Sequence, residues 1–181
     1  VVSSTVPCSN KWMIGTVNSF FIGFIATFIA TTLGTLAALG LSRPHMPYKG
    51  LIMAILISPM IVPLIITAAG MFFFYARINL VYSFTGIILA HVALATPFVV
   101  ITVTATLVGF DMNMVKASQS LGARPVRTFF KVIMPLILPG VISGALFAFI
   151  TSFDEVVIVM FMGSLDQLTI PKQMWAGIRQ E

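Results

Sequence analysis

Residues 84–108 read FTGIILAHVALATPFVVITVTATLV, and no Asp, Glu, Lys or Arg occurs among them. A helix needs about 20 mainly apolar residues to cross the hydrocarbon core of a bilayer. A stretch of this length and composition therefore predicts a membrane-spanning helix. Because backbone polar groups in lipid need partners within the protein, a chain built around such a stretch is expected to be a bundle of helices.

Three more stretches have the same character, and together the four predict a polytopic integral membrane protein of the all-α class. The other three are residues 18–41, 51–75 and 137–163. Of the 181 residues in the chain, 59% are hydrophobic and 8% are charged, whereas a soluble domain carries about 25% charged residues. We therefore expect residues 1–181 to form a single transmembrane domain in a lipid bilayer.

The basic residues predict the orientation and exclude a nucleic-acid partner. The formal net charge is +5, but the Lys and Arg residues lie in the short gaps between apolar stretches. The gap after the third stretch holds Lys116, Arg124, Arg127 and Lys131. Because cytoplasmic loops are enriched in Lys and Arg, this gap is expected in the cytoplasm. The single cysteine, Cys8, excludes an internal disulfide and a zinc cluster, so no metal site or other cofactor is expected.

Helix breaks and a packing face can be anticipated within the spans. Pro59 and Pro63 each remove a backbone donor in the second stretch. A plain kink and a gating element both remain open there, because transporters commonly contain broken helices. In the first stretch, small residues recur at a spacing of four, which predicts close contact with another helix. These residues are Ala26, Ala30, Gly34 and Ala38.

Residues 109–135 are too long for a turn and too polar to cross the membrane. Residues 115–121 predict a short helix, and Gly122 suits a left-handed end to it. Pro125 suits the first turn of a second helix. In that helix one face is apolar, so we expect it to lie on the cytoplasmic membrane surface. Pro135 and Pro139 are then expected to bracket the beginning of the fourth span.

Residues 116–122 (KASQSLG), followed by residues 132–135 (VIMP), resemble the signature loop of permeases in binding-protein-dependent ABC importers. That signature is Glu-Ala-Ala, three residues, Gly, nine residues, then Ile-x-Leu-Pro. Ala117, Gly122 and Pro135 match it at the correct spacing, and Val132 is a conservative replacement. Lys116 departs from the pattern, which has Glu at this position. The departure weakens any inference of a salt bridge between this residue and an ATPase.

The resemblance implies the type I importer permease fold and a cytoplasmic coupling loop at residues 109–135 that docks on a separate ATPase. It assigns coupling to Lys116, Ala117, Ser118, Leu121, Gly122 and Pro135. The expected partners are a second permease subunit, an ATP-binding subunit dimer and an external solute-binding protein, in a bacterial inner membrane. Family members usually have six spans, so the four counted here indicate a fragment. The sequence contains no Gly-x-x-x-x-Gly-Lys-Ser/Thr loop, which places hydrolysis on the separate subunit.

Residues 152–157 (SFDEVV) and 169–175 (TIPKQMW) resemble the branch that serves spermidine, putrescine and related cations. Asp154 and Glu155 are the candidate substrate-path residues, because charged side chains inside a membrane cost roughly 3 kcal/mol and commonly face a cavity. Adjacent helical residues point about 100° apart. We therefore expect one acid to line the path and the other to pair with a neighbouring helix. The competing interpretation is an ion pair or a site near the outer interface.

Other functions stay open on the residues alone. The same fold could carry another solute, such as an amino-acid derivative or ferric ion. A proton-coupled secondary transporter could use Asp154, Glu155 and His91, although a membrane histidine more often hydrogen-bonds a neighbouring helix. A purely structural membrane subunit is a further alternative. No nucleophile, base and orienting group occur at recognisable spacing, so an enzyme is not expected.

Overall fold

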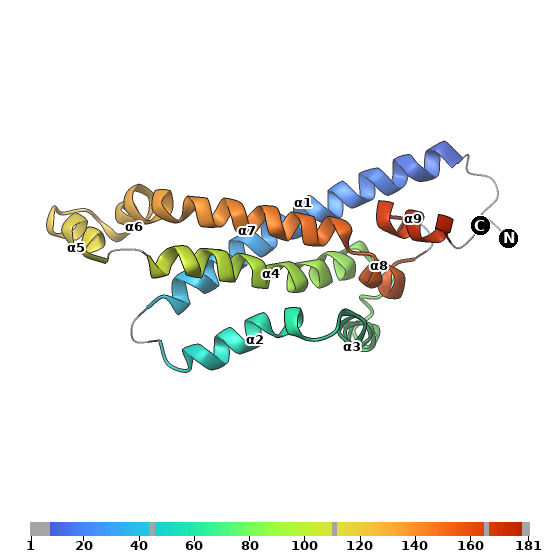
Figure 1. Cartoon of the computed structure of the whole chain (residues 1–181), viewed down its shortest axis with the longest axis horizontal. Coiled ribbons are helices and arrows are strands. Elements are labelled where there is room, and N and C mark those ends of the chain that lie inside the picture. Colours follow the sequence, from blue (N-terminus) through green and yellow to red (C-terminus); the bar gives the residue numbers. More distant parts are fainter. Residues whose placement is uncertain (1–7, 44–45, 110–111, 165–166, 179–181) are drawn as a thin grey trace.

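The computed structural model describes residues 8–43, 46–109, 112–164 and 167–178, and every regular element in these ranges is a helix (Figure 1). The elements are α1 (Cys8–Leu41), α2 (Lys49–Ile61), α3 (Leu64–Arg77), α4 (Phe84–Val108), α5 (Met112–Ser120), α6 (Pro125–Thr128), the π-helix η1 (Phe129–Ile133), α7 (Met134–Asp154), α8 (Val157–Met162) and α9 (Ile170–Ile178). The prediction of an all-α fold is confirmed. Three helices are long and apolar enough to cross a membrane, namely Asn10–Leu41, Phe84–Val108 and Pro125–Asp154.

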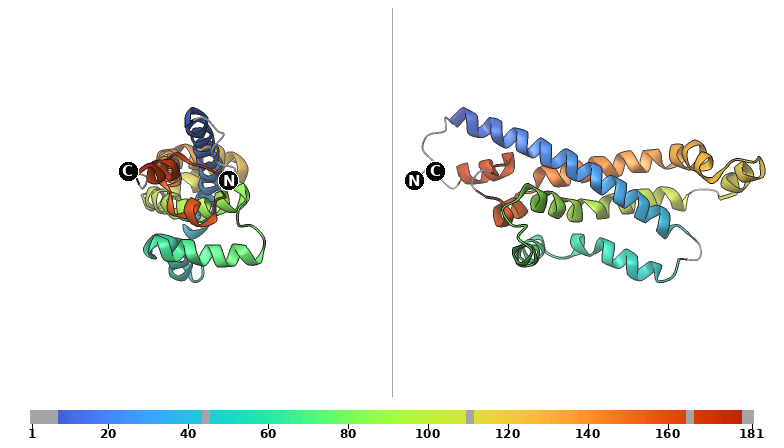
Figure 2. Two further views of the ribbon diagram at one scale, coloured as in Figure 1. Left: turned by 90° about the vertical axis from the view of Figure 1, so that its right-hand side faces the viewer. Right: turned by 180° about the vertical axis from the view of Figure 1, so that it is seen from behind.

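Helix α4 forms the centre of the bundle, with α1 and α7 packed along it (Figure 2). Val99 of α4 is fully buried between two glycines. A Cβ atom on Gly34 of α1 would lie 2.7 Å from the Val99 Cβ, and one on Gly144 of α7 would lie 3.0 Å from its Cα. The small-residue ridge predicted on α1 is therefore a packing face. A second ridge on α7, at Gly140, Gly144 and Ala148, was not anticipated.

The second apolar stretch, over residues 51–75, does not form one straight helix, and of the two breaks anticipated at its prolines the one at Pro63 is confirmed. Helices α2 and α3 meet at 104°, as a broken span or a re-entrant loop. Pro63 stands at the break, where it has no N–H to continue α2. Pro59 lies inside α2 without breaking it. The carbonyl of Ile55, one turn before Pro59, accepts a hydrogen bond from the Ser58 hydroxyl at 2.8 Å.

The fourth apolar segment runs over Pro125–Asp154, so both predicted ends of this span, at residues 137 and 163, were wrong. The expected surface helix after Pro125 does not exist as a separate element, because α6, η1 and α7 follow one another without a break. Pro135 and Pro139 both lie within α7 rather than before it. Pro135 occupies the first turn, where a missing N–H is tolerated. The wider π-turn just before it carries the helix from α6 into α7.

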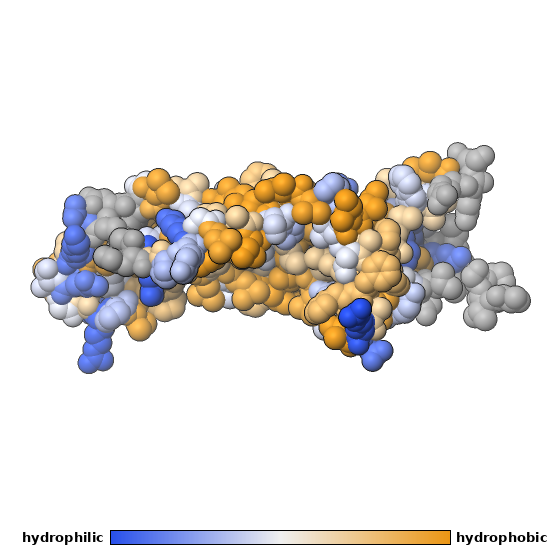
Figure 3. All heavy atoms as spheres, turned by 90° about the horizontal axis from the view of Figure 1, so that it is seen from below, coloured by the Kyte–Doolittle hydropathy of each residue, from blue (hydrophilic) through white to orange (hydrophobic). Residues whose placement is uncertain are grey.

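On the face shown in Figure 3, apolar residues form a belt across the middle of the molecule, and hydrophilic residues gather towards both ends. One end carries α5 together with the end of α1 and the start of α2. The opposite end carries α3, α8 and α9 (Figure 1). Large apolar side chains such as Phe28, Leu33 and Ile142 are exposed on the belt. This distribution is that of a membrane protein, whose surface is covered by lipid instead of water.

Candidate functional site

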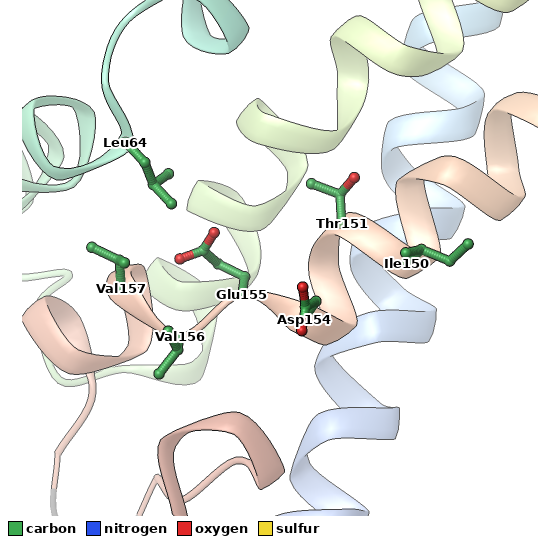
Figure 4. A pocket seen from close by; sticks show the side chains of 7 residues that line it. All are labelled: Leu64, Ile150, Thr151, Asp154, Glu155, Val156 and Val157. Atoms are coloured by element: carbon green, nitrogen blue, oxygen red, sulfur yellow. The ribbon is translucent and has the colours of Figure 1, made fainter. Parts of the chain in front are cut away.

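A cavity of about 330 Å³ lies where two helix breaks face each other (Figure 4). Its lining residues are Leu64, Ile150, Thr151, Asp154, Glu155, Val156 and Val157. Leu64 is the first residue of α3, directly after the α2–α3 break. Asp154 ends α7 and Val157 begins α8. The cavity therefore brings together two pieces of irregular backbone, a feature that membrane proteins permit where it is buried or lines a cavity.

The chain leaves the helical conformation at Glu155, whose backbone is extended with φ −74° and ψ 116°. The Glu155 carboxylate then reaches forward along the chain, and its Oε1 accepts a hydrogen bond from the Ile158 N–H at 3.0 Å. The first N–H groups of a helix have no partner within the helix. Glu155 thus satisfies one of these groups at the beginning of α8, in the manner of an N-cap.

The two acids differ in burial, and both line the cavity. Glu155 is 8% exposed, whereas Asp154 is exposed. Figure 4 shows the Glu155 side chain directed towards Leu64. Both acids line this one cavity because the helix is broken between them and α8; which of them faces the substrate path stays a prediction. Among the residues that the structure describes, no ion pair forms with either carboxylate.

The cavity combines an apolar wall with negative charge. Ile150, Leu64 and the two valines supply the apolar surface, and the hydroxyl of Thr151 adds a hydrogen-bonding group. Its volume lies in the range of small-molecule sites. Two acidic side chains and an apolar wall therefore lie side by side in this cavity.

A buried hydrogen bond holds the end of α7 against α4 beside this cavity. His91 Nδ1 lies 2.8 Å from the Ser152 hydroxyl. Both side chains are buried, with 2% and 5% of their surface exposed. His91 therefore bonds a neighbouring helix, as expected for a packing role. The sequence analysis did not identify Ser152 as the hydrogen-bond partner of His91. The only indication in the sequence was its position two residues before Asp154.

The segment after α8 is fastened to α1 by polar contacts that the sequence did not reveal. The Asn18 amide donates to the Leu168 carbonyl at 2.9 Å, and the Ile170 N–H donates to the Ser19 hydroxyl at 2.9 Å. Lys172 Nζ donates to the carbonyl of Ser164 at 3.1 Å, just past the end of α8. Burial lowers the pKa of this amine. These contacts fix the segment between α8 and α9 in place.

The residues assigned to coupling lie at the opposite end of the molecule (Figure 1). Helix α5 contains residues 115–120 of the predicted 115–121, begins three residues earlier and ends at Ser120. Gly122, two residues further on, has the left-handed conformation that was predicted, with φ 80°. The Ala123 N–H donates to the Ser118 carbonyl at 3.1 Å and the Gly122 N–H donates to the Gln119 carbonyl at 2.9 Å. These two bonds form a Schellman motif.

Most of the proposed coupling residues are exposed and lie on α5 or directly after it. Lys116, Ala117 and Gly122 are exposed, and 89% of the Leu121 surface is exposed. Ser118 is half-buried and turns towards α6. Pro135 does not join this group, because it lies in the first turn of α7. Among the described residues, no group of three His, Cys, Asp or Glu side chains is placed to hold a metal ion.

Comparisons with known proteins agree with this architecture. A family model described as "binding-protein-dependent transport system inner membrane component" matches residues 14–179. The spermidine/putrescine transport system permease protein PotC of Haemophilus influenzae is 32% identical over 163 residues, covering 90% of this chain and 63% of that protein. Its Escherichia coli counterpart is 31% identical over 156 residues, covering 86% and 59%.

A third relative has a different name and a similar degree of identity. The putrescine transport system permease protein PotI of Escherichia coli is 29% identical over 169 residues, covering 89% of this chain and 60% of that protein. The chain thus spans about three fifths of the length of the relatives it matches.

Proposed function

The chain belongs to the family of binding-protein-dependent transport system inner membrane components, and from this membership we propose that it is the permease subunit of an ATP-driven importer for polyamines. The solute would be a small cation such as spermidine or putrescine, which the names of three relatives specify. The chain itself would catalyse no reaction. It would form part of the path through a bacterial inner membrane.

The observation that carries the proposal is the pair of carboxylates in the cavity between the two helix breaks. Asp154 lies exposed at the cavity, and Glu155 is buried within it. A polyamine alternates ammonium groups with short methylene chains, which matches carboxylates set in an apolar wall. Transporters place substrate sites at discontinuous helices. This arrangement favours an organic cation over an anionic or neutral solute.

Helix α5 supports the second half of the proposal, namely coupling to a separate ATPase. It projects beyond the bundle, it is rigidly terminated at Gly122, and its apolar Leu121 is almost fully exposed. We infer that Lys116, Ala117, Ser118, Leu121 and Gly122 contact the ATPase, within a cytoplasmic loop over residues 109–135. Closure of the ATP-binding dimer would then move the spans between two packings.

The α2–α3 break supports a second permease subunit as partner. Ile61 and Ile65, which flank this break, have 74% and 64% of their surface exposed. Irregular backbone cannot face lipid within the hydrocarbon region, because its polar groups would lack partners. A second permease chain packed at the break would cover it. The external solute-binding protein would deliver the solute at the end that carries α3, α8 and α9.

The test is uptake into vesicles that carry the full-length chain with its permease partner, its ATPase and its binding protein. We expect radiolabelled spermidine or putrescine to accumulate only when ATP and the binding protein are present. A pH gradient without ATP should give no accumulation. Uptake driven by the gradient alone would indicate a secondary transporter, and ATP-driven uptake of a different solute would refute the polyamine assignment.

A further inference from the structure

The hydroxyl groups of Ser118 and Thr128 join α5 to the helix that leads into the bundle. Their oxygen atoms lie 3.0 Å apart. Ser118 Oγ also donates to the Val115 carbonyl at 2.9 Å. A hydroxyl group carries one hydrogen, so Thr128 is the donor in the contact between the two side chains. The bond therefore runs from Thr128 of α6 to Ser118 of α5.

Thr128 is placed as a structural anchor and not as a surface group. Only 2% of its surface is exposed, although its neighbours Arg127 and Val126 are exposed. A buried hydroxyl without a partner is costly, and one with a partner fixes the geometry of the elements it joins. Neither the signature loop nor the cavity accounts for a buried polar side chain at this position.

Thr128 also stands at the beginning of a continuous helical path across the molecule. The π-helix η1 follows it directly, then α7, which ends at Asp154 in the cavity. The π-turn is closed by the Met134 N–H donating to the Phe129 carbonyl five residues back. Such turns widen a helix locally and often occur at functional sites. Movement of α5 could therefore be transmitted through α6, η1 and α7 to Asp154 and Glu155.

We propose that Thr128 is a positioning residue, which fastens α5 to α7 through Ser118 so that movement of α5 is transmitted to the cavity. Without this bond, α5 could still seat on its partner, but its motion would be taken up at the junction with α6. The proposal rests on the proposed function for the partner and the solute. The link itself is a property of the fold of this chain.

The experiment compares Thr128→Val with Thr128→Ser in the full importer complex. Valine keeps the branched shape and removes the donor, whereas serine keeps the donor. We expect Thr128→Val to retain ATP hydrolysis and to lower uptake per ATP hydrolysed about fivefold, the effect of losing one hydrogen bond. Thr128→Ser should restore the native ratio. Thr32→Val is the matched control, because the Thr32 hydroxyl bonds only the Phe28 carbonyl of its own helix.

Hydrogen exchange of the α5 amides in the same samples tests the link independently of the solute. Exchange should rise about fivefold in Thr128→Val and stay native in Thr128→Ser and Thr32→Val. The double variant Ser118→Ala with Thr128→Val should exchange no faster than Ser118→Ala alone, because Ser118→Ala already removes the bond to Thr128 together with the bond to the Val115 carbonyl. Unchanged α5 exchange in Thr128→Val would overturn the proposal. Absence of polyamine uptake in the native complex would instead refute the proposed function.

Discussion

Glu155 performs two tasks, and its neighbour Asp154 shares only the second of them. Its carboxylate accepts the Ile158 N–H at 3.0 Å and so supports the first turn of α8. The same carboxylate lines the cavity at the α7–α8 break. The two tasks respond differently to substitution, because hydrogen-bond acceptance needs an oxygen atom and cation attraction needs a charge.

Replacing Glu155 by alanine should lower the thermal stability of the chain in detergent, whereas glutamine should not. Alanine leaves the Ile158 N–H without its acceptor, a loss of about 1 kcal/mol for a helix cap. In a protein of this size, that corresponds to a fall in Tm of roughly 2–4 °C. Glutamine keeps a carbonyl oxygen. Asp154→Ala serves as the control, and equal Tm values for Glu155→Ala and Glu155→Gln would contradict the capping role.

At the scale of elements, the length of the apolar stretches and the positions of the prolines predicted several helix ends. Whether a proline broke its helix depended on whether a nearby side chain compensated for the missing backbone hydrogen bond. The bounds of α4 follow directly from its uncharged sequence, and the end of α1 at Leu41 was correct. Pro63 ends a helix, as its missing donor allows, yet Pro59 and Pro97 stay inside theirs. The Ser58 hydroxyl compensates for Pro59. Such compensation depends on rotamers and neighbours, which composition does not reveal.

The break after α7 could not be predicted from helix-breaking residues. Residues 153–157 (FDEVV) contain neither Gly nor Pro, so hydropathy extends the span to residue 163. An acid before an apolar run is the usual signal for the start of a helix, and Glu155 before Val156 and Val157 provides it. The cavity followed from that break and from the α2–α3 break, which are far apart in the sequence. Asp154 and Glu155 were identified in the sequence because they are charged residues in an apolar stretch. That both line one cavity could be seen only in the folded structure.

Because α4 and α7 are in close contact at Gly144, we expect a larger residue at this position to lower the stability of the bundle. A Cβ atom there would lie 3.0 Å from the Val99 Cα, which is backbone and cannot rotate away. We expect Gly144→Ala to destabilise the bundle by about 1–3 kcal/mol and to lower its Tm by several degrees. Gly40→Ala is the control, since no atom lies within 4 Å of its added Cβ. An unchanged Tm for Gly144→Ala would mean that the helices pack less closely.

We also expect substitution of Gly122, just after α5, to be unfavourable, but because of its backbone conformation and not because of close packing. Space is open around it, but its φ of 80° disfavours any residue with a Cβ. Alanine there should strain the Schellman motif by roughly 1–2 kcal/mol and weaken binding of the ATPase at least about fivefold. Titration of the purified ATPase onto the reconstituted permease measures this affinity. Gly50→Ala, which is in a helix with open space around it, should bind normally; equal affinities would argue against a docking role for the end of α5.

At the scale of the whole molecule, α5 lies at one end of the bundle, and α3 and α8, whose first residues line the cavity, lie at the other (Figure 1). The Lys and Arg residues around α5 support our proposal, under the positive-inside rule, that this end lies in the cytoplasm. The cavity would then lie towards the outer surface, where a binding protein could release its solute. In this proposal the solute site and the coupling site lie at separate ends of the bundle, and α7 would connect them.

This sidedness predicts the labelling pattern of single cysteines introduced into a Cys8→Ser background. Ile78→Cys lies between α3 and α4 and should react with an impermeant maleimide added to intact cells whose outer membrane has been opened. Ser120→Cys, at the end of α5, should react only after the inner membrane is made permeable. Both positions are exposed. Reactivity of Ser120→Cys from outside would reverse the proposed orientation.

The central claim is that the two carboxylates at the α7–α8 break line the path of a cationic solute. Its most direct test is ATP-dependent spermidine and putrescine uptake by the full complex with Asp154→Asn, Glu155→Gln and both together, alongside assembly and Tm. Each replacement keeps the size and an acceptor oxygen, so folding should be preserved. We predict uptake at least about tenfold lower in the double variant, as expected from losing roughly 1.4 kcal/mol of attraction. Native uptake by a correctly assembled double variant would contradict the account.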